Sequence, residues 1–150
     1  MYSMSDISHI PARPDAPIAC DMSAAGDTPE HRLDEYARLF ADALIDRERH
    51  DGAVALVFRA DPRIRATVED LTHREAACCP FFDYRVETIG EKLVWTITNP
   101  VNSEDRASAE AMLEIFYELP DHASATSDGL LDRLATRGIS LITASDASLK

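Results

Sequence analysis

The sequence has few cysteines, few glycines and no long hydrophobic run. Its three cysteines are an odd number and two are adjacent, a pattern that does not fit a disulfide-stapled secreted domain. Only five glycines are present, and no Walker, G-x-S-x-G or dinucleotide-binding pattern occurs, which argues against a phosphate-cradling loop. No segment approaches the roughly 18 consecutive apolar residues of a membrane helix. Several common classes of enzyme and membrane protein are therefore disfavoured.

Basic residues are also scarce. Fifteen lysines and arginines stand against 27 acidic residues, for a formal net charge of −12. This charge repels phosphate backbones and anionic lipids and attracts cations, so we expect neither nucleic acid nor a membrane as a direct partner. The N-terminal segment lacks the basic start and apolar run of a signal peptide, which favours a cytoplasmic location.

The composition that remains is typical of a globular protein. Hydrophobic residues make up 45% and charged residues 28% of the 150 positions, and a chain of this length can bury a core without disulfides. We expect a flexible N-terminal arm over residues 1–16 and one α+β domain over 17–119. Residues 120–150 are expected to form a linker and a C-terminal appendage packed on the domain.

Changes of hydrophobic period predict the elements of the first half. A short strand is expected at 17–22. Thr28 and Pro29 combine a capping hydroxyl with proline at the first helical position, which predicts a helix to about His50. Alternation over 53–58 then predicts a strand, and Asp61-Pro62 predicts the start of a second helix that Pro80 limits.

The second half predicts a hairpin followed by a helix. Residues 82–87 and 93–97 alternate on either side of a turn that contains Gly90, and a capped helix follows over 102–119. A short helix near 130–138 and the GISLI segment complete the appendage; GISLI forms a fifth strand or packs on the surface. The resulting fold class is α+β, a largely antiparallel four-stranded sheet with helices packed on one side, in the order β-α-β-α-β-β-α plus a C-terminal helical appendage.

The second helix carries the candidate site. On a helical wheel, Glu75 and Cys78 fall in the same sector as the apolar stripe of that helix, with Cys79 at its edge. A buried carboxylate must be protonated, paired, or facing a cleft that holds a cation. The alternatives are that the helix unwinds before Glu75 or that Glu75 pairs with an arginine such as Arg85.

The cysteines have three interpretations. They lie at a helix C-terminus in an acidic protein, where nothing in the sequence lowers a thiol pKa, so a nucleophilic thiolate is disfavoured. A soft metal ion supplies its own positive charge and deprotonates its thiol ligands, so this objection does not apply to metal binding. Cys20 on the first strand would complete a site with two or three thiols. All three cysteines as buried core residues are an equally open alternative.

The I-A-C segment ending at Cys20 and the E-x-x-C-C-P-F-F segment from Glu75 to Phe82 together resemble a family of small bacterial cysteine-pair domains. Similar domains occur alone and appended to MerR-type metal-responsive regulators. The resemblance spans about residues 17–118, and the C-terminal extension departs from it. It implies mercury or another soft metal as the context, but it implies no direct transcriptional role because no MerR-like DNA-binding helices precede the domain.

We therefore hypothesise a thiol-based binding module for a soft metal or metalloid ion such as Hg(II), with Cys20, Cys78 and Cys79 as ligands and Glu75 as an auxiliary group. The ion is the expected partner. The second hypothesis is a thiol-dependent enzyme or redox protein in which Glu75 assists a cysteine. The third is a structural domain with buried cysteines that forms a homodimer.

Overall fold

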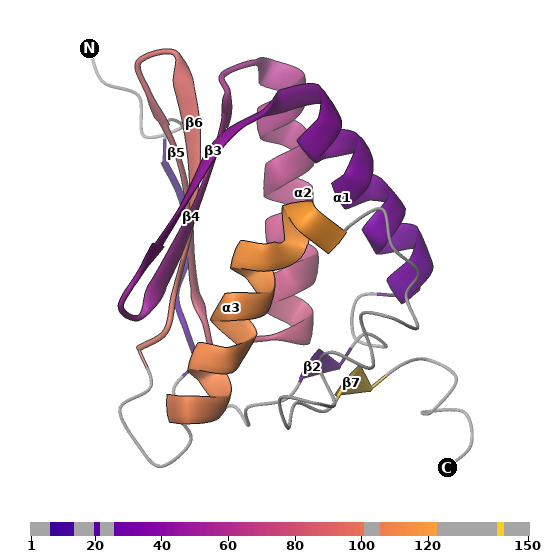
Figure 1. Cartoon of the computed structure of the whole chain (residues 1–150), viewed down its shortest axis with the longest axis vertical. Helices are drawn as coiled ribbons and strands as arrows, with labels where there is room; N and C mark the ends of the chain where they lie inside the picture. The colour runs from indigo at the N-terminus through magenta and orange to yellow at the C-terminus, as the bar shows by residue number, and fades with distance from the viewer. Residues whose placement is uncertain (1–6, 14–19, 22–25, 101–105, 123–140, 143–150) are drawn as a thin grey trace.

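The computed structural model describes residues 7–13, 20–21, 26–100, 106–122 and 141–142. Within them the chain forms a five-stranded antiparallel sheet and three helices, so the predicted α+β class is confirmed. All three helices lie against one face of the sheet (Figure 1). In this part of the chain, no helix combines the length and the apolar character needed to cross a bilayer.

The main sheet has the strand order β1-β5-β6-β4-β3, and every neighbouring pair is antiparallel. Its two hairpins are β3–β4 and β5–β6, and β1 adds an edge strand beside β5. A separate pair, β2 and β7, is parallel and joins the two ends of the chain. The strands are β1 (Ile7–Ile10), β2 (Cys20–Asp21), β3 (Leu44–His50), β4 (Ala53–Arg59), β5 (Asp83–Ile89), β6 (Lys92–Thr98) and β7 (Leu141–Ile142).

The first two helices start as the sequence predicts. α1 (Pro29–Ala43) is capped by Thr28, whose hydroxyl accepts a hydrogen bond from the backbone N–H of His31, and α2 (Pro62–Cys78) is capped in the same way by Asp61. Each has proline at its first position, where no intrahelical N–H bond is lost. α3 (Arg106–His122) packs over β4 and β3.

The core lies between the helices and the sheet. Alternate residues of β4 and β6 point to the helices, and the buried indole of Trp95 stacks on Tyr36 of α1 with ring centroids 6.2 Å apart. Each large side chain buried in this way stabilises the fold by about 1.5–3 kcal/mol relative to exposure. The same core holds the inner face of α2 in place, which positions the candidate site.

Two predicted elements in the first half were wrong in extent. The helix expected to reach His50 ends at Ala43, and residues 44–50 form β3 instead. The reason is the Asp51-Gly52 pair, a strong hairpin signal, with Gly52 at a φ of +79° that suits glycine. β3 makes the sheet five-stranded together with β1, which comes from the segment expected to be a flexible arm.

The strand predicted at 17–22 is reduced to two residues and lies outside the main sheet, paired with β7. GISLI contributes β7, in agreement with one of its two predicted alternatives. The predicted hairpin is confirmed, with Gly90 in its turn at a φ of +61°. The α3 helix continues through Pro120 to His122, beyond the expected start of the linker, and the helix expected near 130–138 lies outside the described residues.

Candidate functional site

Glu75 is a carboxylate on the inner face of α2, in the same buried row as Ile64, Val68 and Leu71. It is 7% exposed, as the helical wheel predicted. Its partner is Arg32 of α1, which is 4% exposed and whose Nη1 donates to Oε1, while the Tyr36 hydroxyl donates to Oε2 at 3.0 Å. The carboxylate is therefore paired, which is the condition for burying it at tolerable cost.

The predicted alternative that Glu75 pairs with an arginine is confirmed, but the partner is Arg32 and not Arg85, the example given. Arg85 lies on β5, where its Nη1 is 4.0 Å from the carboxylate of Glu87. Arg32 is instead presented by α1, one helical turn before Tyr36. That spacing was the available signal: an arginine four residues before an inward tyrosine lies on the same helix face.

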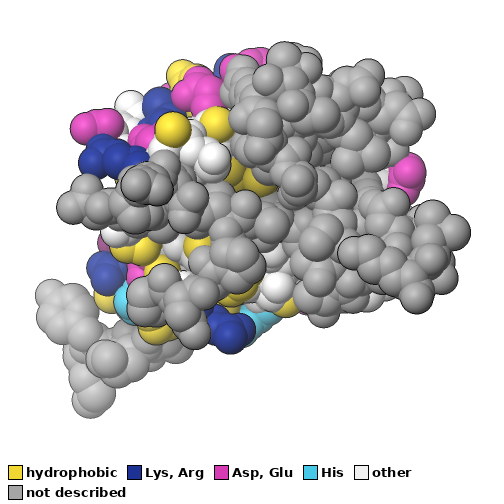
Figure 2. Space-filling view, turned by 90° about the horizontal axis from the view of Figure 1, so that it is seen from below, with side chains coloured by type: hydrophobic (Ala, Val, Ile, Leu, Met, Phe, Trp, Pro, Cys, Tyr) yellow, Lys and Arg dark blue, Asp and Glu magenta, His cyan; other side chains and the backbone are white. Residues whose placement is uncertain are grey.

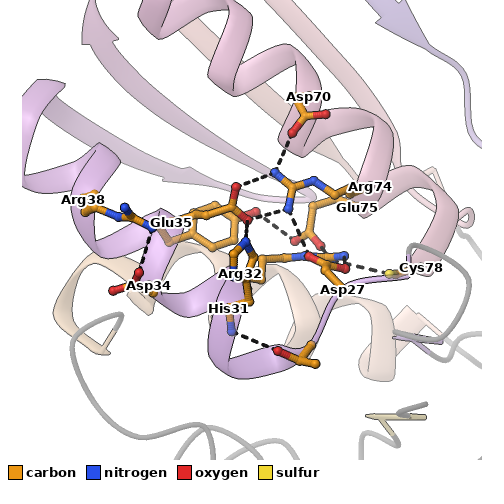
Figure 3. Close-up of polar contacts among 12 residues, drawn as sticks. Asp27, His31, Arg32, Asp34, Glu35, Arg38, Asp70, Arg74, Glu75 and Cys78 are labelled. Carbon is orange, nitrogen blue, oxygen red and sulfur yellow. Dashed lines mark hydrogen bonds and ion pairs between the residues drawn. The ribbon is translucent and has the colours of Figure 1, made fainter.

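Asp27, just before α1, holds the other side of the Arg32 guanidinium. Its two oxygens accept from Nε at 2.9 Å and from Nη2 at 2.5 Å, a bidentate geometry that fixes the plane of the guanidinium (Figure 3). Burial acts to raise the pKa of Asp27, but the hydrogen bond and the charge of Arg32 outweigh it and lower this pKa below its usual value. Arg32 is therefore held between the carboxylates of Asp27 and Glu75.

A second guanidinium extends this cluster toward the surface. Arg74 contacts Glu35 with an Nη2–Oε1 distance of 3.0 Å, Asp70 at 2.6 Å and Asp27 at 3.0 Å. The hydrogen bond from Arg74 is the largest cause of the lowered pKa of Glu35. With Glu75, the cluster has four carboxylates and two guanidiniums, so it carries an excess of two negative charges and favours cations over anions.

Cys78 points into this cluster from the last position of α2 (Figure 3). It is 1% exposed, and its Sγ accepts a hydrogen bond from Arg32 Nη1 at 3.4 Å. Burial raises the pKa of the Cys78 thiol, and the charge of Arg32 offsets this only in part, so the thiol pKa stays above its ordinary value. Cys78 is a buried, protonated thiol with a cation beside its sulfur.

Cys79 follows the last residue of α2 as its C-cap and is also buried, at 2% exposed. Its N–H donates to the carbonyl of Glu75, and its own carbonyl accepts from the Tyr84 hydroxyl at 2.8 Å. The backbone leaves helical geometry here, with φ −127° and ψ 69°, and the following proline disfavours the helical region at this position. The sulfur of Cys79 is in a disulfide bond, a state that the sequence analysis did not predict.

Cys20 lies on β2, whose backbone is in contact with α2. The fold thus brings the strand of the first cysteine to the helix that ends in the other two. Among the described side chains, no group of three or more histidines, cysteines or carboxylates is arranged to hold a metal ion. The side chain of Cys20 is not among them, so the three-thiol set stays a prediction.

The sequence analysis missed the residues that form ion pairs and hydrogen bonds around Glu75, which are Asp27, Arg32, Tyr36 and Arg74. They come from two elements that are about 40 residues apart, and only packing of α1 on α2 brings them together. Comparisons with known proteins found no match: no family model, no curated protein and no solved structure is similar to the chain.

Proposed function

We propose that this protein is a thiol-based binding module for a soft metal or metalloid ion of the mercury type, with Cys78 and Cys79 as ligands and Cys20 as the third. One observation carries the proposal. Two adjacent, buried cysteines end a helix against an ionised cluster with an excess of negative charge, and the strand of Cys20 contacts that helix. Soft thiolate ligands select soft ions over hard ones.

The surroundings of Cys78 suit a thiol that loses its proton only when an ion arrives. A buried thiol with a raised pKa stays protonated and unreactive in the empty protein, whereas a bound ion supplies the charge that stabilises the thiolate. Arg32, 3.4 Å from the sulfur, would then donate to that thiolate. Both oxygens of Glu75 already accept hydrogen bonds, so we assign Glu75 the indirect role of holding Arg32 in place.

The disulfide at Cys79 makes the structure the oxidised form of the proposed site. A dithiol reductant would convert this disulfide to two thiols and would itself become a disulfide. Each ligand thiol would then transfer its proton to water as the ion binds. We propose the cytoplasm as the working compartment because it keeps thiols reduced.

The test is a titration of the reduced protein with Hg(II), As(III) and Zn(II), followed by thiolate-to-metal absorbance and by intact mass. We expect one ion of Hg(II) or As(III) per chain, with two or three thiols lost to alkylation, and weaker binding of Zn(II), which prefers four ligands. The matched controls are the oxidised protein and the variant in which all three cysteines are serine. Stoichiometric binding by the serine variant would refute the proposal.

A redox role is the second candidate, favoured by the disulfide at Cys79 and the free thiol of Cys78, its neighbour in the sequence. It requires fast alkylation of one thiol after reduction, at a rate that shows a lowered pKa. Non-reducing peptide mapping would identify the cysteine that is bonded to Cys79. Slow alkylation of every thiol would leave the metal-binding proposal as the better one.

A further inference from the structure

The guanidinium of Arg32 is fixed against the sulfur of Cys78. Its Nη1 carries two hydrogens and donates both to Oε1 of Glu75 and to Sγ of Cys78, the latter at 3.4 Å (Figure 3). Nε and Nη2 donate to the two oxygens of Asp27. The guanidinium therefore cannot turn away from the sulfur without breaking its hydrogen bonds to two carboxylates.

Arg32 is also a buried cation. In the view from below, acidic and basic side chains lie at the described surface (Figure 2), where water and salt screen their charges. Arg32 is only 4% exposed, so its charge acts on its neighbours with much less screening. A charge in this position acts strongly on any group that binds to the adjacent sulfur.

The charge of Arg32 prevails at this sulfur, although the cluster as a whole has an excess of negative charge. Burial raises the pKa of the Cys78 thiol. Among the nearby charges, that of Arg32 lowers this pKa and has a larger effect than that of Glu75 or that of Asp27, which raise it. A negative charge that develops on the sulfur is therefore stabilised first by the guanidinium.

The two soft ions of the proposed function form complexes of different charge with three thiols. Hg²⁺ and three RSH groups give Hg(SR)₃⁻ and release three protons to water, so this complex is an anion. As(OH)₃ and three RSH groups give As(SR)₃ and three water molecules, so this complex is neutral. In both reactions S–H bonds break, bonds from sulfur to the ion form, and no oxidation state changes. With only two thiols, Hg(SR)₂ and As(SR)₂OH are both neutral.

We propose that Arg32 determines the ion specificity of this site, by favouring Hg(II) bound to three thiolates over As(III) bound to the same three sulfurs. A cation fixed beside a ligand sulfur stabilises an anionic complex and has much less effect on a neutral one. The inference rests on the proposed function, because it takes Cys20, Cys78 and Cys79 as the ligands. Asp27 and Glu75 are positioning residues that hold the guanidinium against the sulfur.

The test is a competition between Hg(II) and As(III) for the reduced full chain. Absorbance distinguishes three-coordinate from two-coordinate thiolate complexes of mercury, and alkylation followed by intact mass counts the thiols that each ion protects. We expect three protected thiols with either ion. In the double variant Arg32→Met, Glu75→Gln, the ratio of Hg(II) affinity to As(III) affinity should fall about tenfold or more, because the anionic complex loses a charged hydrogen-bond donor.

The ratio separates a specificity role from a structural one, because displaced thiols would weaken both complexes. Glu75→Gln is included so that no buried carboxylate loses Arg32 without compensation, and Asp27 keeps its contact with Arg74 at 3.0 Å. Arg32→Lys keeps the positive charge and should keep the ratio closer to wild type than the double variant does. Arg74→Met is the matched control: it removes the other guanidinium of the cluster and should leave the ratio unchanged.

An unchanged ratio in the double variant would overturn the inference but leave the thiol-binding proposal in place. A wild-type Hg(II) complex that is two-coordinate, with two protected thiols, would overturn it as well, because that complex is neutral. This measurement needs no variant. If neither ion binds the reduced wild-type protein, the proposed function is refuted and this inference with it.

Discussion

Replacing Arg32 with methionine tests whether the buried ion cluster is organised as described. The change keeps much of the apolar stem of the side chain but removes the guanidinium. Glu75, 7% exposed, then loses its cation and keeps only the Tyr36 hydroxyl, and Asp27 loses its bidentate partner. Removing one partner of a buried pair costs about 3–5 kcal/mol, because the other charge stays buried without compensation.

That loss is a large part of the total stability, since domains of this kind unfold with about 5–15 kcal/mol. At about 2–4 °C per kcal/mol for a chain of this size, the melting temperature should fall by roughly 6–20 °C. The assay is urea unfolding at pH 7 under non-reducing conditions, so that the disulfide at Cys79 is the same in both proteins. The midpoint should fall with little change in slope.

Two comparisons make this result specific. Glu75→Gln combined with Arg32→Met should cost less than the sum of the single changes, because the buried charge is gone. Arg38→Met breaks the exposed Arg38–Asp34 pair, whose N–O distance is 2.7 Å, and should cost less than about 0.5 kcal/mol. A loss below about 1 kcal/mol for Arg32→Met would refute the reasoning, because the buried Arg32–Glu75 pair would then contribute little to the stability of the fold.

Three further predictions concern the groups around the cluster and the main hairpin. The interactions that lower the pKa of Asp27 stabilise the fold above the unfolded pKa of about 3.9, and this stability is lost as the pH falls through the lower pKa of the folded protein. Asp27→Asn should therefore be less stable than wild type at pH 7, and acid unfolding should show that it loses less stability below about pH 4. Tyr84→Phe removes the hydroxyl that donates to the Cys79 carbonyl and should cost about 0.5–1.5 kcal/mol in urea unfolding; no loss would show that water replaces it. Gly52→Ala places a side chain at a backbone φ of +79° and should lower the free energy of unfolding by about 1–2 kcal/mol. The cause is backbone strain and not a clash, because the new Cβ would meet only the Asn99 carbonyl, at 3.8 Å. An unchanged melting temperature would contradict this argument.

Local signals predicted most elements, and they failed where two signals competed. The helical pattern that begins at Pro29 predicts a helix to His50, yet residues 44–50 form a strand because the Asp51-Gly52 turn pairs them with β4 in a hairpin. Strand pairing outweighed the helical pattern here because β4 offers a complete ladder of hydrogen bonds and a buried neighbour. β1 escaped prediction because four residues next to several prolines carry too little periodicity, and only pairing with β5 makes them a strand.

The sequence by itself determined the α+β class, the caps of α1 and α2, the β5–β6 hairpin and the inward direction of Glu75 and Cys78, because these follow from neighbours within a few residues. Tertiary structure alone decided that Arg32 and Asp27 surround that carboxylate, that β2 approaches α2, and that Cys79 is oxidised beside a thiol. The physical reason is the distance along the chain over which each interaction acts. Helix and strand periods are set locally, whereas the partner of a buried charge depends on which distant element packs against it.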